Sequence, residues 1–159
     1  MTEQRKKIKC LAYYDTLDSK DRRYNNPAAY TKFSYVLECL QRLGYNVEIL
    51  SASYGLDKKY IKGTTRKLSE KATLTTIGSL GRGNKLRNML SNACFSLKLW
   101  FAVNALVKNG DTLLVYHSLG YLDKVKKLKK RKNIRLLLEV EEIYGYVVNS
   151  EKAIAKENE

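Results

Sequence analysis

The sequence predicts an α/β fold: a Rossmann-like, doubly wound, mainly parallel sheet of about five or more strands flanked by helices. Short apolar runs alternate with helical segments along nearly the whole chain, which is typical of such sheets. Some of these runs, such as residues 113–116 and 136–138, are apolar throughout, which suits strands buried on both faces. Near the N-terminus, two strands connected through a helix form a βαβ unit, and strands joined in this way are parallel.

The first βαβ unit has the clearest boundaries. Residues 7–14 form a β-rich apolar run and predict the first strand. Asn26 is the expected N-cap of a helix, and Pro27 suits the first helical position. Apolar residues then recur at helical spacing until Gly44, which suits the left-handed conformation that ends a helix. Residues 46–51 predict the second strand.

The rest of the chain continues the alternation. The expected elements are an irregular stretch over 53–71, a threonine-rich strand over 72–77, a glycine-rich loop over 78–84, a long helix over 85–108, a strand over 111–116, a short basic helix over 122–132 and a strand over 134–140. We assign residues 1–150 to one domain. Residues 151–159 are polar and predict the start of a connection to something larger.

Composition narrows the functional classes. Three separated cysteines and a single histidine give no metal-binding spacing, so we expect no metal and buried, reduced thiols in a cytoplasmic protein. We expect no secretory signal, because the apolar stretch after the charged residues 1–9 is short, and the sequence contains no run of about 20 apolar residues. The net charge of +14 predicts an anionic partner, which the charge alone leaves open between nucleic acid, acidic lipid and a phosphorylated ligand.

The single histidine is the strongest candidate for a functional residue. His117 and Ser118 directly follow the strand over 111–116, and Gly120 comes soon after them. Ligands of open α/β sheets collect at the carboxyl ends of strands. A neutral imidazole there can hydrogen-bond a sugar hydroxyl or stand close to a charged transition state, and the alternative is an ordinary histidine at a strand end.

The loop after the first strand is expected at the same edge of the sheet. Arg22, Arg23 and Asn25 in this loop offer donors for a phosphate or hydroxyl ligand, and arginine suits bidentate phosphate recognition. The alternative is a solvated surface loop. A second glycine-rich segment, residues 78–83, has the glycine spacing of a phosphate-binding loop, but Asn84 stands where such a loop has lysine.

The stretch over residues 95–107 of the long helix is nearly apolar all round, which favours a buried helix. The alternative is an edge that faces an anionic membrane, where basic residues flank aromatic ones. The residues of that membrane surface are Lys85, Arg87, Lys98, Trp100 and Phe101. The basic run over 124–135 is either a solvated helix face or a surface for phospholipid headgroups or RNA, although no nucleic-acid motif accompanies it.

The order of these pieces resembles the N-terminal domain of GT-B fold glycosyltransferases of the family-four type. The resemblance rests on the strand over 7–14, the segment NNPAAYTKFSYVLECLQRLGYNVEIL, the strand DTLLVYHS and the strand RLLLEVEEIYG. In such enzymes two Rossmann-like domains face a cleft, and the N-terminal domain binds the acceptor while the C-terminal domain binds the nucleotide sugar. The common double glycine of the first loop is absent here, so we expect no diphosphate contact from that loop.

The resemblance implies the roles of individual residues. His117 matches the family's histidine near the transferred sugar and becomes the expected catalytic residue. The expected acceptor-binding residues are Arg22, Arg23, Asn25, Asn26 and Ser118. The expected partner is a C-terminal donor-binding domain that residues 151–159 would lead into. The resemblance also implies a position on the inner face of the membrane.

These observations predict the acceptor-binding half of a glycosyltransferase. The parent enzyme would move a hexose from a nucleotide diphosphate sugar to a lipid-linked or saccharide acceptor in polysaccharide biosynthesis. We expect no cofactor besides these two substrates. The isolated domain is expected to be inactive, because transfer needs both sides of the cleft. The alternatives are a stand-alone, flavodoxin-like basic module that binds nucleic acid, or a helper subunit of a split glycosyltransferase.

Overall fold

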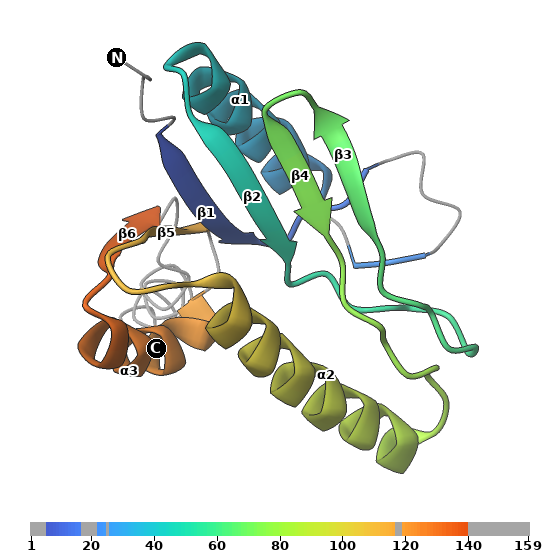
Figure 1. Ribbon diagram of the computed structural model, residues 1–159. Coiled ribbons are helices and arrows are strands. Elements are labelled where there is room, and N and C mark those ends of the chain that lie inside the picture. Colours follow the sequence, from blue (N-terminus) through green and yellow to red (C-terminus); the bar gives the residue numbers. More distant parts are fainter. Residues whose placement is uncertain (1–5, 17–21, 25, 117–118, 140–159) are drawn as a thin grey trace, which may run out of the picture.

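A six-stranded sheet with helices on both faces forms the core of the protein (Figure 1). The computed structural model describes residues 6–16, 22–24, 26–116 and 119–139. Residues 140–159, including the expected connection, lie outside them. The strands are β1 (Lys7–Ala12), β2 (Asn46–Ser51), β3 (Thr65–Ser69), β4 (Ala72–Thr75), β5 (Thr112–Tyr116) and β6 (Arg135–Glu139). The helices are α1 (Pro27–Arg42), α2 (Lys85–Leu106) and α3 (Leu122–Lys132), with a short 3₁₀ turn η1 (Leu119–Tyr121) before α3.

The sheet has the strand order β3-β4-β2-β1-β5-β6, and every neighbouring pair except β3–β4 is parallel. This arrangement confirms the predicted α/β class and the mainly parallel sheet. The antiparallel strand β3 corrects the expectation of an irregular stretch over 53–71. β3 is a charged edge strand that pairs with β4 through a tight turn, and its hydroxyl pair Thr65–Thr75 lies 3.1 Å apart.

The helix caps follow the sequence signals. The side chain of Asn26 accepts hydrogen bonds from the backbone N–H groups of Ala28 and Ala29, and Pro27 opens α1. Gly44 has φ of +85°, a left-handed conformation that glycine adopts without steric cost. Asn84 caps α2 by accepting from the N–H of Arg87 at 2.9 Å.

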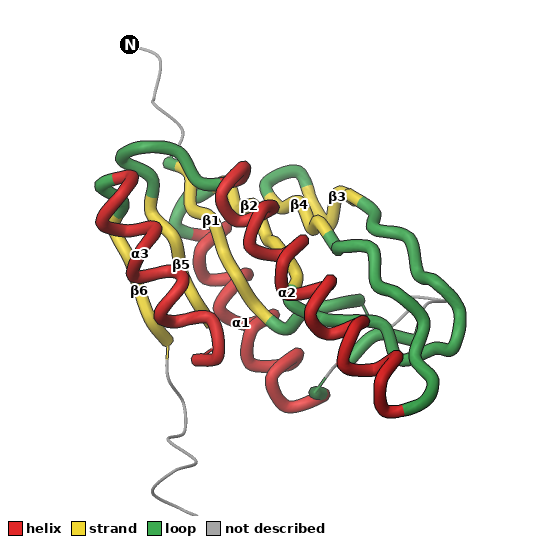
Figure 2. The backbone as a smooth tube through the Cα atoms, turned by 90° about the horizontal axis from the view of Figure 1, so that it is seen from below, coloured by secondary structure: helices red, strands yellow, loops and turns green. Residues whose placement is uncertain are grey.

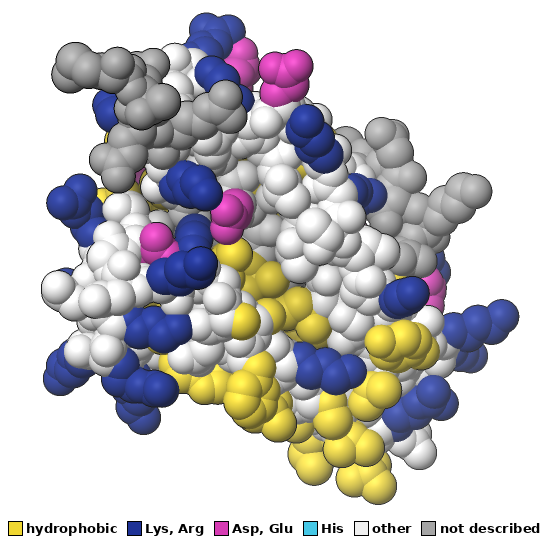
Figure 3. Space-filling model, viewed as in Figure 1, with side chains coloured by type: hydrophobic (Ala, Val, Ile, Leu, Met, Phe, Trp, Pro, Cys, Tyr) yellow, Lys and Arg dark blue, Asp and Glu magenta, His cyan; other side chains and the backbone are white. Residues whose placement is uncertain are grey.

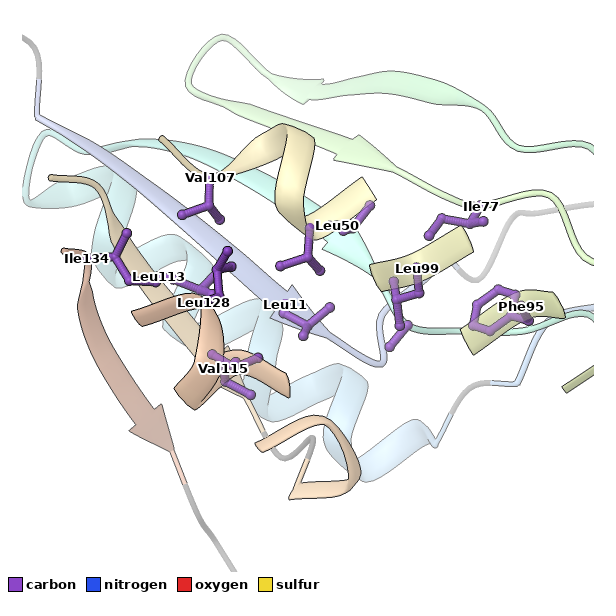
Figure 4. Packing of buried hydrophobic residues seen from close by; sticks show 13 residues of the cluster. Leu11, Leu50, Ile77, Phe95, Leu99, Val107, Leu113, Val115, Leu128 and Ile134 are labelled. Atoms are coloured by element: carbon purple, nitrogen blue, oxygen red, sulfur yellow. The ribbon is translucent and has the colours of Figure 1, made fainter. Parts of the chain in front are cut away.

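Two separate apolar clusters cover the two faces of the sheet, with α1 on one side and α2 and α3 on the other (Figure 2). β1 alternates between them: Ile8, Cys10 and Ala12 pack in the cluster under α1, and Leu11 packs in the cluster under α2 and α3. Figure 4 shows the second cluster, in which Leu99 of α2 and Leu128 of α3 meet the sheet. Both faces of the central strands are therefore buried, as expected for a parallel sheet.

The strand β6 departs from the expectation of burial on both faces. It is the edge strand of the sheet in the described residues, and Leu137 and Leu138 remain 43% and 42% exposed. The apolar run over 136–138 identified the strand correctly, but a run of leucines carries no information on whether a further strand pairs with it.

The direction in which successive strands are added to the sheet changes between β1 and β5. Along the chain the sheet grows from β1 toward β2 and β4, and then continues on the other side of β1 with β5 and β6. Ala12 at the end of β1 pairs with Tyr116 at the end of β5, so both strands end at the same edge. In doubly wound sheets, ligands bind outside the carboxyl ends of the strands at such a switch point.

Candidate functional site

The candidate site lies at the carboxyl edge of the sheet, around the switch point between β1 and β5. The structure ends β5 at Tyr116, and the predicted catalytic His117 follows in the sequence. His117 and Ser118 fall outside the described residues, as does Asn25, so their expected roles stay predictions. The described residues at this edge form two groups, one aromatic and one charged.

Four tyrosines form the aromatic group, called here the tyrosine cluster: Tyr13, Tyr24, Tyr54 and Tyr121. Tyr13 directly follows β1, Tyr54 follows β2, and Tyr121 ends η1 beyond β5. Tyr13 packs edge-on against Tyr24 with ring centroids 5.6 Å apart and lies 6.5 Å from Tyr121. Tyr24 and Tyr54 stack at 5.2 Å, and the guanidinium of Arg82 lies 4.4 Å from the Tyr54 ring centre. Tyr24 is 39% exposed, so this ring remains accessible to a ligand at the carboxyl edge of the sheet.

Two tyrosines of the cluster, Tyr13 and Tyr121, are held as neutral phenols. Burial, followed by the charge and hydrogen bond of Tyr121, raises the pKa of Tyr13. Burial likewise raises the pKa of Tyr121, against the effect of its hydrogen bond with Tyr13. Aromatic rings with a hydroxyl at the tip offer both an apolar face and a hydrogen-bonding group, a combination suited to a ligand with hydroxyls on an apolar ring.

The charged group, called here the arginine cluster, consists of Asp15, Arg23 and Arg66. Arg23 is 7% exposed, and its guanidinium donates to three backbone carbonyls. They are the carbonyls of Ser53 after β2, Ile77 after β4, and Lys62 in the intervening loop, at 3.2, 2.8 and 2.9 Å. Arg23 therefore ties the long loop after β1 to the ends of two neighbouring strands.

Asp15 supplies the carboxylate of the arginine cluster. Its side chain is only 4% exposed, forms an ion pair with Arg66 of β3, and lies 3.7 Å from the Nε atom of Arg23. Its Oδ1 atom also accepts from the N–H of Thr16 at 2.8 Å. One buried carboxylate thus balances two guanidinium groups where the first loop leaves the sheet.

The residues predicted in the first loop have different surroundings. Arg22 is exposed and lines a surface depression of about 460 Å³ together with Leu56, Asp57, Lys58 and Lys59. Arg23 points inward into the arginine cluster, and the Asn26 side chain is occupied in capping α1. Of the predicted acceptor-binding residues that the structure describes, Arg22 is therefore the one with an exposed side chain bordering a hollow.

The glycine-rich loop over 78–83 is not arranged as an anion cradle. Its N–H groups at Ser79, Arg82 and Gly83 donate to the Ile61 carbonyl, the Asp57 carbonyl and the Asn88 side chain. The glycines instead allow close packing, since a Cβ atom on Gly81 would lie 1.9 Å from the carbonyl oxygen of Lys58. Glycine spacing alone does not distinguish these two uses.

Replacing Gly81 by alanine should lower the free energy of unfolding by about 1–3 kcal/mol, because the added methyl group overlaps backbone that must move. Urea unfolding measures the loss. The matched control is Gly120→Ala, where an added Cβ meets nothing within 4 Å, and its unfolding should change little. Equal stabilities of the two variants would contradict the tight packing of the loop on Lys58.

The sequence contained a signal for the tyrosine cluster that its interpretation missed. The chain has 12 tyrosines, and several of them lie at the ends of predicted strands or a few residues beyond. Such positions converge at one edge of a parallel sheet, so Tyr13 and Tyr54 were predictable as neighbours. Asp15 carried a weaker signal, because a carboxylate at a strand end gives no indication of burial or of its cationic partners.

The comparisons with known proteins bear on the fold. No family model and no curated protein matches the sequence. Among solved structures, the chain is similar to alpha,alpha-trehalose 6-phosphate synthase from Burkholderia multivorans, with a TM-score of 0.51 and 11% sequence identity. The similarity covers 84% of this chain and 32% of the synthase, so the chain spans about a third of that protein's length. At this identity the likeness shows the fold alone, and it does not establish the resemblance to family four.

Proposed function

We propose that this chain is the acceptor-binding half of a glycosyltransferase that moves a hexose from a nucleotide diphosphate sugar to a lipid-linked or saccharide acceptor. The observation that carries the proposal is the position of the tyrosine cluster, at the β1–β5 switch point of a glycosyltransferase-like sheet. The partner that this function requires is a second domain that binds the nucleotide sugar.

The side chains at the carboxyl edge of the sheet suit binding of an acceptor better than binding of a nucleotide. The first loop contains no glycine, and three N–H groups of the glycine-rich loop donate within the protein, so neither loop has the backbone cradle that a diphosphate prefers. Tyrosine rings and phenolic hydroxyls suit a saccharide, which has apolar ring faces and many hydroxyl groups. Arg22, Lys58 and Lys59 at the neighbouring depression suit an anionic part of the acceptor, such as the phosphate of a lipid carrier.

The test of this function joins the chain to the donor-binding domain that the proposal requires and supplies nucleotide diphosphate hexoses with lipid-linked or free saccharides. Release of nucleoside diphosphate that depends on the acceptor is the expected result. Its absence with every donor and acceptor pair would contradict the proposal.

A variant tests whether the tyrosine cluster binds the acceptor in that reaction. Tyr24→Ala removes an exposed ring of the tyrosine cluster and should raise the KM for the acceptor about tenfold, while the KM for the donor stays unchanged. The matched control is Tyr35→Ala on α1, which removes a ring that is 67% exposed but lies on a helix away from this cluster. An equal acceptor KM in both variants would remove the tyrosine cluster from the acceptor site.

A further inference from the structure

The outward face of α2 is unusually apolar for an exposed helix. Five large side chains lie along it with exposed fractions between 57% and 70%: Leu86, Met89, Leu90, Leu97 and Phe101. The opposite face of the same helix is also apolar and packs on the sheet through Phe95, Leu99 and Val103. Helices that cover a sheet normally present a polar face to water. We call the five exposed apolar residues of α2 the leucine stripe, and we expect another surface to cover them.

The exposed apolar residues of α2 differ from those predicted for the membrane surface. Trp100 is half-buried and packs against the core cluster under α2, whereas Phe101 is 64% exposed. The apolar part of the surface is therefore supplied chiefly by leucines and by Met89, which the sequence pattern did not separate from the buried residues. Figure 3 shows hydrophobic side chains gathered along α2, with Lys and Arg side chains beside them.

Positive charge surrounds this stripe. α2 and α3 lie on the same side of the sheet and touch through Lys124, whose ammonium donates to Ser96 at 2.8 Å (Figure 2). α2 contains three basic residues and α3 seven, while Asp123 is the only acidic residue in either helix. Most of the basic side chains of α3 are exposed. We call the outward surfaces of these two helices the α2–α3 face.

We propose that the α2–α3 face docks on an anionic lipid surface. The leucine stripe would enter the boundary between headgroups and acyl chains, and the lysines and arginines would lie at the anionic headgroups. Nucleic acid would use the charges but leave the leucine stripe exposed to water. A second copy of the chain would bring two strongly basic faces together, which opposes association. Among the described residues, no helix combines the length and the apolar character needed to cross a bilayer.

The inference is independent of the proposed transfer reaction, because it concerns a face of the helices and not the carboxyl edge of the sheet. Its probe is a set of vesicles made of zwitterionic lipid alone or of zwitterionic lipid mixed with anionic phosphatidylglycerol. Co-sedimentation of the whole chain should show strong binding to the mixed vesicles and at least tenfold weaker binding to the neutral ones.

The apolar stripe is tested by Leu97→Gln combined with Phe101→Gln, two exposed positions where circular dichroism should show an unchanged fold. The partition coefficient on mixed vesicles should fall by about tenfold or more, because two side chains lose their burial in lipid. The matched control combines Tyr35→Gln with Leu43→Gln, each 67% exposed near α1, and should bind as the unaltered chain does. Equal losses in both variants would overturn the assignment of the stripe.

The charge is tested by neutralising Lys126, Lys127 and Lys130 of α3 with glutamine, which should weaken binding to mixed vesicles on the order of a hundredfold. The control neutralises Arg42, Lys67 and Lys71, which lie on α1, on β3 and beside β4, and should cost only a few-fold.

Two outcomes besides failed binding would overturn the proposal. One is a dimer in analytical ultracentrifugation that the Leu97 and Phe101 variant abolishes, because the stripe would then bind a second copy. The other is tight, salt-dependent RNA binding without vesicle binding, which would assign the lysines to nucleic acid.

Discussion

Replacing Asp15 by alanine should lower the free energy of unfolding by about 3–5 kcal/mol. The carboxylate is 4% exposed, and it balances Arg23 and Arg66 in a part of the protein with little access to water. Removing it takes away the carboxylate that lies beside the 2% exposed guanidinium side chain of Arg23. The three carbonyls that Arg23 contacts would still accept its hydrogen bonds, but they carry no net charge. Urea unfolding followed by circular dichroism measures the effect.

The control for Asp15 is an exposed ion pair in the same protein. Glu38 and Arg42 lie one turn apart on α1, with side chains 56% and 78% exposed, so Glu38→Ala should cost about 0.5 kcal/mol or less. Adding Arg23→Met to Asp15→Ala completes a double-mutant cycle, and the two changes together should cost less than their sum. A loss below about 1 kcal/mol for Asp15→Ala would show that the buried charges do not depend on this carboxylate.

The predicted elements succeeded where the signal was local. The cap at Asn26 and the apolar periodicity gave the start of α1, and the bounds of β2 and α3 agree with the expected ranges. β3 was missed because its sequence, TRKLS, has one apolar residue in five, and its strand geometry comes from pairing with β4. An edge strand needs little burial, so hydrophobic patterning cannot detect it.

The candidate site was harder to predict because its residues act through partners that lie far away in the sequence. Arg23 and Asn25 were equivalent as loop residues with polar side chains. Only the fold shows that Arg23 is buried against the ends of β2 and β4, some 30 to 54 residues away. For the long apolar helix, the sequence pattern did not show which residues would be exposed. Its pattern predicted burial, and the structure buries one face while leaving Leu97 and Phe101 exposed on the other.

Replacing His117 by alanine should reduce turnover by about 10²–10⁴-fold in an enzyme that joins this domain to a donor-binding domain. His117 follows β5 directly in the sequence, and β5 ends beside β1 at the switch point, next to the strand that leads into Tyr13. A group that acts on the reacting sugar lowers kcat when it is removed and leaves donor binding intact. Steady-state kinetics, together with calorimetric binding of the nucleotide sugar, separates these effects.

The pH dependence distinguishes a catalytic imidazole from one that only fills space. If the neutral ring is the active form, kcat should fall toward acidic pH, because protonation removes the acceptor nitrogen. His117→Gln keeps a hydrogen-bonding group of similar size but has no titrating ring, so its residual activity should lose that acidic limb. The matched control is Lys129→Gln on α3, a polar exchange outside the carboxyl edge, which should preserve both kcat and the limb. An acidic limb that persists in His117→Gln, or turnover in His117→Ala equal to that of the unaltered enzyme, would exclude His117 from the transfer step.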